Sequence, residues 1–230
     1  AFLQRFPTRR SLAEASPAEI LQYWSGLGYN RRALYLHACV QALAKQKDFP
    51  EQVEELQKLP GLGPYTAAAV LSFALNKDVV VVDVNIALLF KRIFFPRRDV
   101  ERIAQEVLPL GRSRDWHNAL MDIGSLYCHR KKPDCVSCPL QKMCASASDE
   151  KKITTTWDTK KVKAFKSSDG IVRGGILKLL TIKDGQPLEL IYRALELQGI
   201  ERDKKIFQII VHKLEKDGLV VQKGKILFLP

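Results

Sequence analysis

The sequence predicts a mainly α-helical protein that ends in a small α+β domain. Up to about residue 148, apolar residues recur at helical spacing in short segments that Gly and Pro separate. A polar, lysine-rich stretch follows over residues 149–168. Beyond it, three further helical segments precede two short apolar runs. We therefore expect a first domain over 1–148, a linker over 149–168 and a second domain over 169–230.

The helix with the clearest start follows Ser16, which can cap it, with Pro17 at the first helical position and Glu19 completing a capping box. Residues 79–82 are strand-like but isolated, so we expect a buried connector there. In the second domain, Lys223 and Gly224 are expected to join 219–221 and 226–229 as a hairpin, which with three helices is the pattern of a winged helix. Helices are expected over 32–46, 51–58, 65–75, 85–94, 100–107, 116–127, 171–182, 186–199 and 201–217.

The charge of the chain favours an anionic partner. The net charge is +12, from 37 basic and 25 acidic residues, and nucleic acid is the usual partner of such a surplus. Residues 151–230 hold 17 basic and 9 acidic side chains, hence +8 of the total. No run is apolar enough to span a membrane, and the first ten residues lack the apolar region of a signal peptide. We expect a cytoplasmic, nucleoid-associated protein.

Four of the five cysteines lie within 17 residues, at Cys128, Cys135, Cys138 and Cys144. This crowding, in a chain without an export signal, indicates metal ligation in a reducing compartment rather than disulfides. Four thiolates suit either structural zinc or an iron–sulfur cluster, and geometry alone does not choose between them. Cys39, in an expected helix, is interpreted as an ordinary buried thiol.

A glycine-containing turn lies between two expected helices, in the segment LPGLGPYTAAAV of residues 59–70. Gly61 and Gly63 allow a tight turn, and amides at the start of the next helix can hold a phosphate. The segment resembles the helix-hairpin-helix of base-excision DNA glycosylases. The spacing C-x6-C-x2-C-x5-C resembles the 4Fe–4S loop of the endonuclease III and MutY glycosylases, and WHNALMDIGSLYC (116–128) resembles the family helix that leads into it.

The resemblance implies a helix-hairpin-helix glycosylase domain with a 4Fe–4S cluster on the four cysteines. The implied partner is double-stranded DNA with a mismatched or damaged base. Gly61, Gly63 and Thr66 of the hairpin would contact that DNA.

Asp83 is the candidate catalytic carboxylate. An Asp before a helix is usually an N-cap, but the family places a catalytic Asp one helix and one connector beyond the hairpin, as here. The resemblance implies that Asp83 stabilises an oxocarbenium-like sugar and that Asn85 orients it, with Val84 where the family commonly has Gly. Tyr65 stands where strand-cleaving relatives have a nucleophilic Lys. Tyrosine cannot form a Schiff base, so base removal without strand cleavage is expected.

Residues 24–33, WSGLGYNRRA, resemble the MutY segment W-x-GLGY-x-x-RA more closely than its thymine-mismatch equivalent. The family's tyrosine wedges into the DNA stack, so Tyr29 is expected to hold the duplex open for base flipping. A core tyrosine after a glycine turn is the structural alternative. Arg31 and Arg32 are expected to hold phosphates, unless they are only solvated helix charges.

The function that the resemblance implies is hydrolysis of the N-glycosidic bond of a flipped adenine opposite guanine or 8-oxoguanine. A thymine or uracil mismatch glycosylase is the first alternative, and a noncatalytic DNA-binding regulator is the second. Residues 169–230 are too short for the Nudix-like domain with which typical MutY proteins sense 8-oxoguanine. The family's catalytic Glu belongs to a segment upstream of Ala1, so we expect an upstream segment or a second chain to complete the site.

Overall fold

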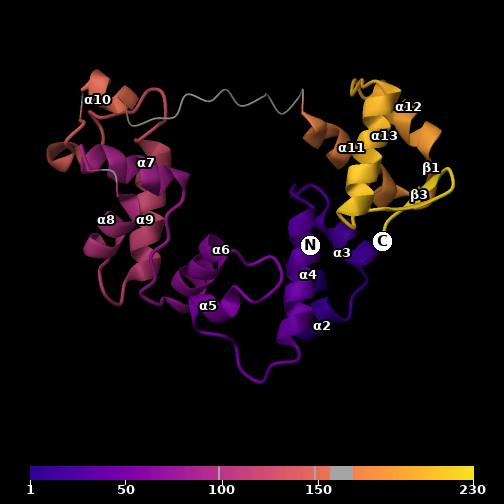
Figure 1. Ribbon diagram of the computed structural model, residues 1–230, viewed down its shortest axis with the longest axis horizontal. Coiled ribbons are helices and arrows are strands. Elements are labelled where there is room, and N and C mark those ends of the chain that lie inside the picture. Colours follow the sequence, from indigo (N-terminus) through magenta and orange to yellow (C-terminus); the bar gives the residue numbers. More distant parts are fainter. Residues whose placement is uncertain (98, 148, 156–167) are drawn as a thin grey trace. The chain divides into compact units, whose positions relative to one another are not determined.

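The computed structural model describes all residues except 98, 148 and 156–167, and it divides into two compact units (Figure 1). Unit 1 contains residues 1–49, 59–61 and those described from 168 onward. Unit 2 contains residues 50–58 and those described from 62 to 155. In the described part of the chain, no helix has the length and apolar character that a membrane crossing requires.

Unit 1 begins with four helices, of which the sequence predicted the last two. Ser16 caps α3 as predicted, because its Oγ accepts the Glu19 N–H at 3.2 Å. The Glu19 carboxylate does not complete a capping box; it accepts a hydrogen bond from Arg5 Nε at 2.8 Å. The helices are α1 (Phe2–Arg5), α2 (Arg9–Ala13), α3 (Pro17–Trp24) and α4 (Arg31–Leu43).

The C-terminal part of unit 1 has the predicted three helices and hairpin, with one additional strand. The antiparallel strand order is β1-β3-β2, with Gln186 and Gln222 both opposite Leu227. The predicted turn residues were wrong by one position: Lys223 pairs with Ile226, so the turn lies at Gly224, where φ is +60°, and the residue after it. The elements are α11 (Asp169–Ile182), β1 (Gln186–Pro187), α12 (Leu188–Leu197), α13 (Lys204–Lys216), β2 (Val221–Lys223) and β3 (Ile226–Phe228). The name winged helix stays a prediction.

The core of unit 1 is built from both ends of the chain. Ile20 of α3 and Ala33 of α4 are fully buried in the same cluster as Ile176 of α11 and Ile210 and Leu214 of α13. The C-terminal helices therefore cover an apolar face of the N-terminal ones (Figure 1). Residues 1–43 share their core with residues 169–230, while the predicted domain boundaries stay a prediction.

Unit 2 is a set of helices around a core of Ile86, Leu89, Phe90, Ile103 and Leu120. The predicted helix over 65–75 divides into α6 and a π-helical turn, η1, after which a connector without regular secondary structure runs to Asp83. Val81 of this connector is buried, as predicted. Part of the predicted linker is helical, as α10, and its residues 156–167 lie outside the described ones. The elements are α5 (Val53–Leu56), α6 (Pro64–Ala69), η1 (Val70–Ala74), α7 (Val84–Ile93), α8 (Val100–Val107), α9 (Ser113–Leu126), η2 (Gln141–Met143) and α10 (Glu150–Thr155).

Candidate active site and cysteine loop

Asp83 is held at the start of α7 by the helix that it caps. Its Oδ1 accepts the N–H groups of Asn85 at 2.9 Å and of Ile86 at 2.7 Å, and the Asn85 side-chain amide donates to Oδ2 at 3.3 Å. The helix start also favours negative charge. The side chain is therefore fixed and still half-exposed, so both the ordinary capping role and a role toward a ligand are compatible with its position.

Tyr65, in the first turn of α6, is electrostatically coupled to Asp83. Burial, and next the negative charge of Asp83, raise the pKa of the Tyr65 phenol above its ordinary value of 10.0. The side chain is still 48% exposed. At neutral pH the phenol is therefore protonated and can donate a hydrogen bond near the Asp83 carboxylate.

Two residues that sequence reasoning did not single out position Asp83 and Asn85. A Cβ at Gly124 of α9 would lie 3.0 Å from Asn85 Cβ, so glycine lets α9 approach the first turn of α7. His117, also on α9, is 2% exposed, and its Nε2 accepts the Val81 N–H at 3.0 Å. Both lie in the segment WHNALMDIGSLYC, whose interpretation rested on family resemblance rather than on the contacts of its residues.

The buried His117 ring is neutral, with Nε2 as the acceptor and Nδ1 as the donor in a small network with Val81, Ser113 and Ser72. Nδ1 donates to the Ser113 carbonyl at 2.7 Å, and the Ser72 hydroxyl lies 3.1 Å from the same atom. Burial lowers the pKa of His117 below its ordinary value of 6.5, although the Ser113 carbonyl opposes this effect. Val81 lies two residues before Asp83. By accepting the Val81 N–H, His117 therefore fixes the connector that positions the Asp83 carboxylate.

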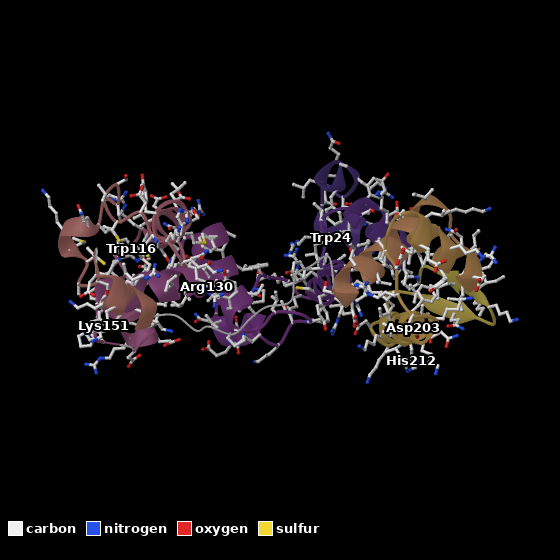
Figure 2. The ribbon with its side chains drawn as sticks, turned by 90° about the horizontal axis from the view of Figure 1, so that it is seen from above. Trp24, Trp116, Arg130, Lys151, Asp203 and His212 are labelled. Atoms are coloured by element: carbon white, nitrogen blue, oxygen red, sulfur yellow. The ribbon has the colours of Figure 1, made fainter. Side chains whose placement is uncertain are left out.

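Tyr29 of unit 1 is on an exposed, strained loop and not in a core. Its side chain is 83% exposed and its φ is +48°, in the left-handed region. Trp24 closes the loop, since its indole N–H donates to the Gly28 carbonyl at 2.9 Å (Trp24 is labelled in Figure 2). The Arg32 guanidinium carbon lies 5.2 Å from the centre of the Tyr29 ring and 5.8 Å from that of Trp24. The alternative of a core tyrosine is therefore wrong.

Arg31 is partly engaged within unit 1. It donates to the Tyr35 hydroxyl and lies 3.4 Å from Asp217, a residue that also binds Arg173 at 2.6 Å. The Asp217 carboxylate is shared between the guanidinium groups of Arg31 and Arg173, so a net positive charge remains on the three side chains. The Arg31 side chain is also half-exposed. Arg32 is exposed, and its guanidinium lies over the aromatic rings of Tyr29 and Trp24.

The hairpin glycines differ in what the structure requires of them. Gly61 has φ +77°, and a Cβ there would overlap the Tyr35 side chain, so no other residue fits without a shift. Gly63 is the extended N-cap of α6, and a Cβ there meets nothing, so its small size is not enforced by packing. Thr66, like Gly63, is exposed. Gly61 belongs to unit 1, whereas Gly63 and Thr66 belong to unit 2.

The structure brings the four cysteines of the loop to one cavity. Cys128, Cys135, Cys138 and Cys144 all line it, together with Arg92 of α7. Among the described residues, no group of three or more His, Cys, Asp or Glu side chains is placed to hold a metal ion. A cluster spreads its ligands over several iron atoms, so its thiols need not converge on one point as those of zinc do. The donor set fits an iron–sulfur cluster.

Arg92 is the buried cation of this loop, with only 2% of its surface exposed. It donates to Cys128 Sγ at 3.3 Å and to the carbonyls of His129 and Arg130 at 3.0 Å. Burial raises the pKa of the Cys128 thiol, and Arg92 opposes that rise by stabilising the thiolate. Sequence reasoning missed Arg92, because a basic residue in the last turn of a helix usually faces solvent. Cys39 is buried on α4, as predicted.

The comparisons with known proteins agree with this geometry. The model of the HhH-GPD superfamily of base excision DNA repair proteins matches residues 1–110. An adenine DNA glycosylase of Mycolicibacterium smegmatis is 33% identical over 235 residues, which cover 96% of this chain and 76% of that relative. The chain belongs to this glycosylase family. An adenine DNA glycosylase of Mycobacterium tuberculosis is 38% identical over 150 residues, 60% of this chain and 49% of the relative.

Solved structures of DNA glycosylases resemble this glycosylase as well. A thermostable thymine-DNA glycosylase has a TM-score of 0.57 at 26% identity, over 66% of this chain and 73% of that one. A trapped endonuclease III–DNA covalent intermediate has a TM-score of 0.54 at 26% identity, over 66% of this chain and 74% of that one. The predicted helix-hairpin-helix fold, the glycosylase class and duplex DNA as the partner are thereby confirmed.

Proposed function

We propose that this glycosylase hydrolyses the N-glycosidic bond of an adenine that is mispaired with guanine or 8-oxoguanine and flipped out of the duplex. The observation that carries the proposal is the Asp83 carboxylate, fixed by two backbone N–H groups and by Asn85 and coupled to the neutral phenol of Tyr65. The choice of adenine is supported by the relatives, which bear the name adenine DNA glycosylase.

Asp83 acts on the sugar. As the bond to the base breaks, positive charge develops on the deoxyribose, and a fixed carboxylate stabilises that charge without having to reorganise. Oδ1 is occupied by the helix N–H groups, whereas Oδ2 accepts the longer Asn85 bond and is the oxygen we assign to the sugar cation. Asn85 is thus a positioning residue.

Tyr65 sets the outcome of the reaction. A phenol that keeps its proton cannot attack the sugar as an amine does, so water completes the hydrolysis and the strand stays intact. The raised pKa of Tyr65 keeps the phenol a hydrogen-bond donor toward the sugar, its phosphate or the carboxylate.

The proposed DNA contacts are distributed over both units. Tyr29 is exposed, so it can insert into the base stack as a wedge. The Arg32 guanidinium lies over the Tyr29 ring and would bind a phosphate beside it. About half of the Arg31 side chain is exposed and could contact a phosphate in the complex with DNA. On the hairpin, Gly61, Gly63 and Thr66 would present backbone amides and a hydroxyl to the DNA backbone. We expect the protein to work in the cytoplasm, at the nucleoid.

We propose that Cys128, Cys135, Cys138 and Cys144 hold a 4Fe–4S cluster. The shared cavity supports this assignment, as does Arg92, which offsets the negative charge of the thiolates. The cluster would supply a structural brace for residues 128–144, which carry four exposed or half-exposed basic side chains: Arg130, Lys131, Lys132 and Lys142. The chain's own contribution is to present that charge to the DNA backbone.

The test is base release by the full-length protein from duplexes that carry adenine, thymine or uracil opposite guanine or 8-oxoguanine, followed by alkaline cleavage of abasic sites. Asp83→Asn should lower the rate of adenine release by roughly 10²–10³-fold. Asp99→Asn is the matched control, because Asp99 also caps a helix of unit 2, accepting the Arg102 N–H at 3.1 Å. Equal rates for the two variants would overturn the role of Asp83.

A thymine or uracil mismatch glycosylase is the second candidate. The likeness to a thymine-DNA glycosylase structure favours it, and release of thymine or uracil but not adenine would establish it. Tight duplex binding without release of any base would instead favour the noncatalytic regulator.

A further inference from the structure

Helix α13 presents a solvent-facing stripe that the glycosylase site does not use. Its Phe207, Ile210, Val211 and Leu214 are buried in the core of unit 1. At 100° per residue, the exposed residues opposite them fall within about 100° of the helix circumference. These residues, here called the α13 face, are Lys205, Gln208, Ile209, His212 and Lys216.

The α13 face is basic, and it contains no acidic residue. Its cations are Lys205, Lys216 and, when protonated, His212, which lies at the outer edge of unit 1 in Figure 2. The acidic residues beside the face, Asp203 and Glu215, each accept a backbone N–H group. Asp203 caps the helix by accepting the Lys205 N–H at 2.8 Å, and Glu215 accepts the Gln222 N–H at 3.2 Å. Glu215 also lies 4.0 Å from His212.

The β2–β3 hairpin extends this charge. The bond from the Gln222 N–H to Glu215 fixes β2 beside the C-terminal half of α13. Residues 221–226 are exposed and include Lys223 and Lys225 but no acidic residue. The hairpin therefore adds two basic residues beside the C-terminal half of α13. The flanking Lys204 and Lys213 are instead paired with Glu189 at 3.2 Å and with Asp169 at 3.5 Å.

The dimensions of the α13 face match the major groove of duplex DNA. Lys205 and Lys216 are eleven residues apart, about 16 Å along the helix axis. The groove is about 12 Å wide and admits an α-helix, so cations at the two ends of the face reach the phosphates on its two sides. Between them lie Gln208, whose amide can pair with adenine, and Ile209, which is 54% exposed and suits the thymine methyl group.

We propose that the α13 face binds in the major groove of duplex DNA, with Lys223 and Lys225 on adjacent phosphates. This second DNA site needs no mismatch and does not rest on the glycosylase chemistry. It also lies in the same unit as the Tyr29 loop: α13 ends at Lys216, and the next residue, Asp217, pairs with Arg31 at 3.4 Å. Duplex held by α13 is therefore held by the unit that carries Tyr29.

The test measures binding of the full-length protein to an undamaged duplex as a function of salt, so its result is independent of base release. The logarithm of the binding constant K falls linearly with the logarithm of the salt concentration. Each lost phosphate contact makes this negative slope shallower by about 0.9. Lys205→Gln with Lys216→Gln should therefore reduce the slope by about 1.8 and weaken binding. Glutamine keeps helix propensity, and circular dichroism confirms that the variant is folded.

The matched control is Lys45→Gln with Lys47→Gln, which removes the same charge from exposed residues that follow α4. A slope that falls for the α13 variant and stays for this control supports the proposal. The proposal is overturned if the salt slope of the α13 variant is unchanged, or if the slopes of the two variants change equally. An unchanged slope would indicate that the α13 face binds a protein partner instead of DNA. In addition, guanine N7 methylation should be blocked by the unsubstituted protein. Protection that persists in the α13 variant would also refute the assignment.

Discussion

His117→Phe should make the stability of unit 2 lower and less dependent on pH. Phenylalanine keeps an aromatic ring in the buried site but offers no acceptor to the Val81 N–H. A buried amide left without a partner costs about 1–3 kcal/mol, so we expect a loss of about 2 kcal/mol at pH 7.5. The Ser113 carbonyl and the Ser72 hydroxyl also lose their contact with Nδ1.

The pH dependence follows from the direction of the pKa shift. Burial lowers the pKa of His117 below 6.5, so the folded state binds fewer protons than the unfolded state. The stability contributed by neutral His117 is fully present above pH 6.5 and is lost as pH falls toward the folded pKa. One site contributes at most about 1.4 kcal/mol per pH unit in that window. A protonated ring would also set an Nε2–H against the Val81 N–H, which explains why the neutral form is preferred.

The assay is guanidinium unfolding at pH 7.5 and 5.5 for the unsubstituted protein and for His117→Phe, with hydrogen exchange of the Val81 amide as a local probe. The difference in stability between the two proteins should shrink at pH 5.5 by up to about 1.4 kcal/mol. Val81 should exchange faster in the variant at both pH values. The reasoning is refuted if the difference is the same at both pH values, or if Val81 exchange is unaltered.

Three further outcomes are expected. Cys138→Ser should lose iron and acid-labile sulfide and bind DNA more weakly, because the basic loop loses its brace; colourless, fully active protein with stoichiometric zinc would contradict the cluster. Borohydride should trap no covalent protein–DNA adduct, because Tyr65 cannot form a Schiff base, and efficient trapping would reveal a lysine nucleophile. Gly124→Ala should slow base release roughly tenfold or more by displacing Asn85, with melting temperature as the control for folding, and an unaltered rate would remove Gly124 from the site.

Local patterns in the sequence predicted most helices, because apolar spacing and capping residues act over a few positions. The helix over 100–107 was predicted at its observed bounds, as α8 shows. Short helices such as α1 and α2 were missed, because four or five residues are too few to display a period. The two-residue β1 was missed because pairing with β3, not its own composition, makes it a strand.

The candidate site was predicted only where a residue's role follows from its neighbours in the chain. Asp83 before a helix was recognisable, and its hydrogen bonds to the start of α7 are local. Arg92 and His117 were not, because their partners lie about 36 residues away and an interior position cannot be read from a polar side chain. Similarly, nothing in residues 1–43 indicates that residues beyond 168 complete their core.

The shared core of unit 1 constrains how the protein is made. At 5–20 residues per second, a ribosome needs roughly 6–25 s to proceed from the end of α4 to the start of α11. During that interval the apolar face around Ile20 and Ala33 lacks the C-terminal residues that complete its core, whereas the helices of unit 2 already have their local partners. Unit 2 should therefore fold first during synthesis, although it is encoded second. We expect a chaperone to act on the N-terminal helices, because their contacts with α11 and α13 are of long range and form late.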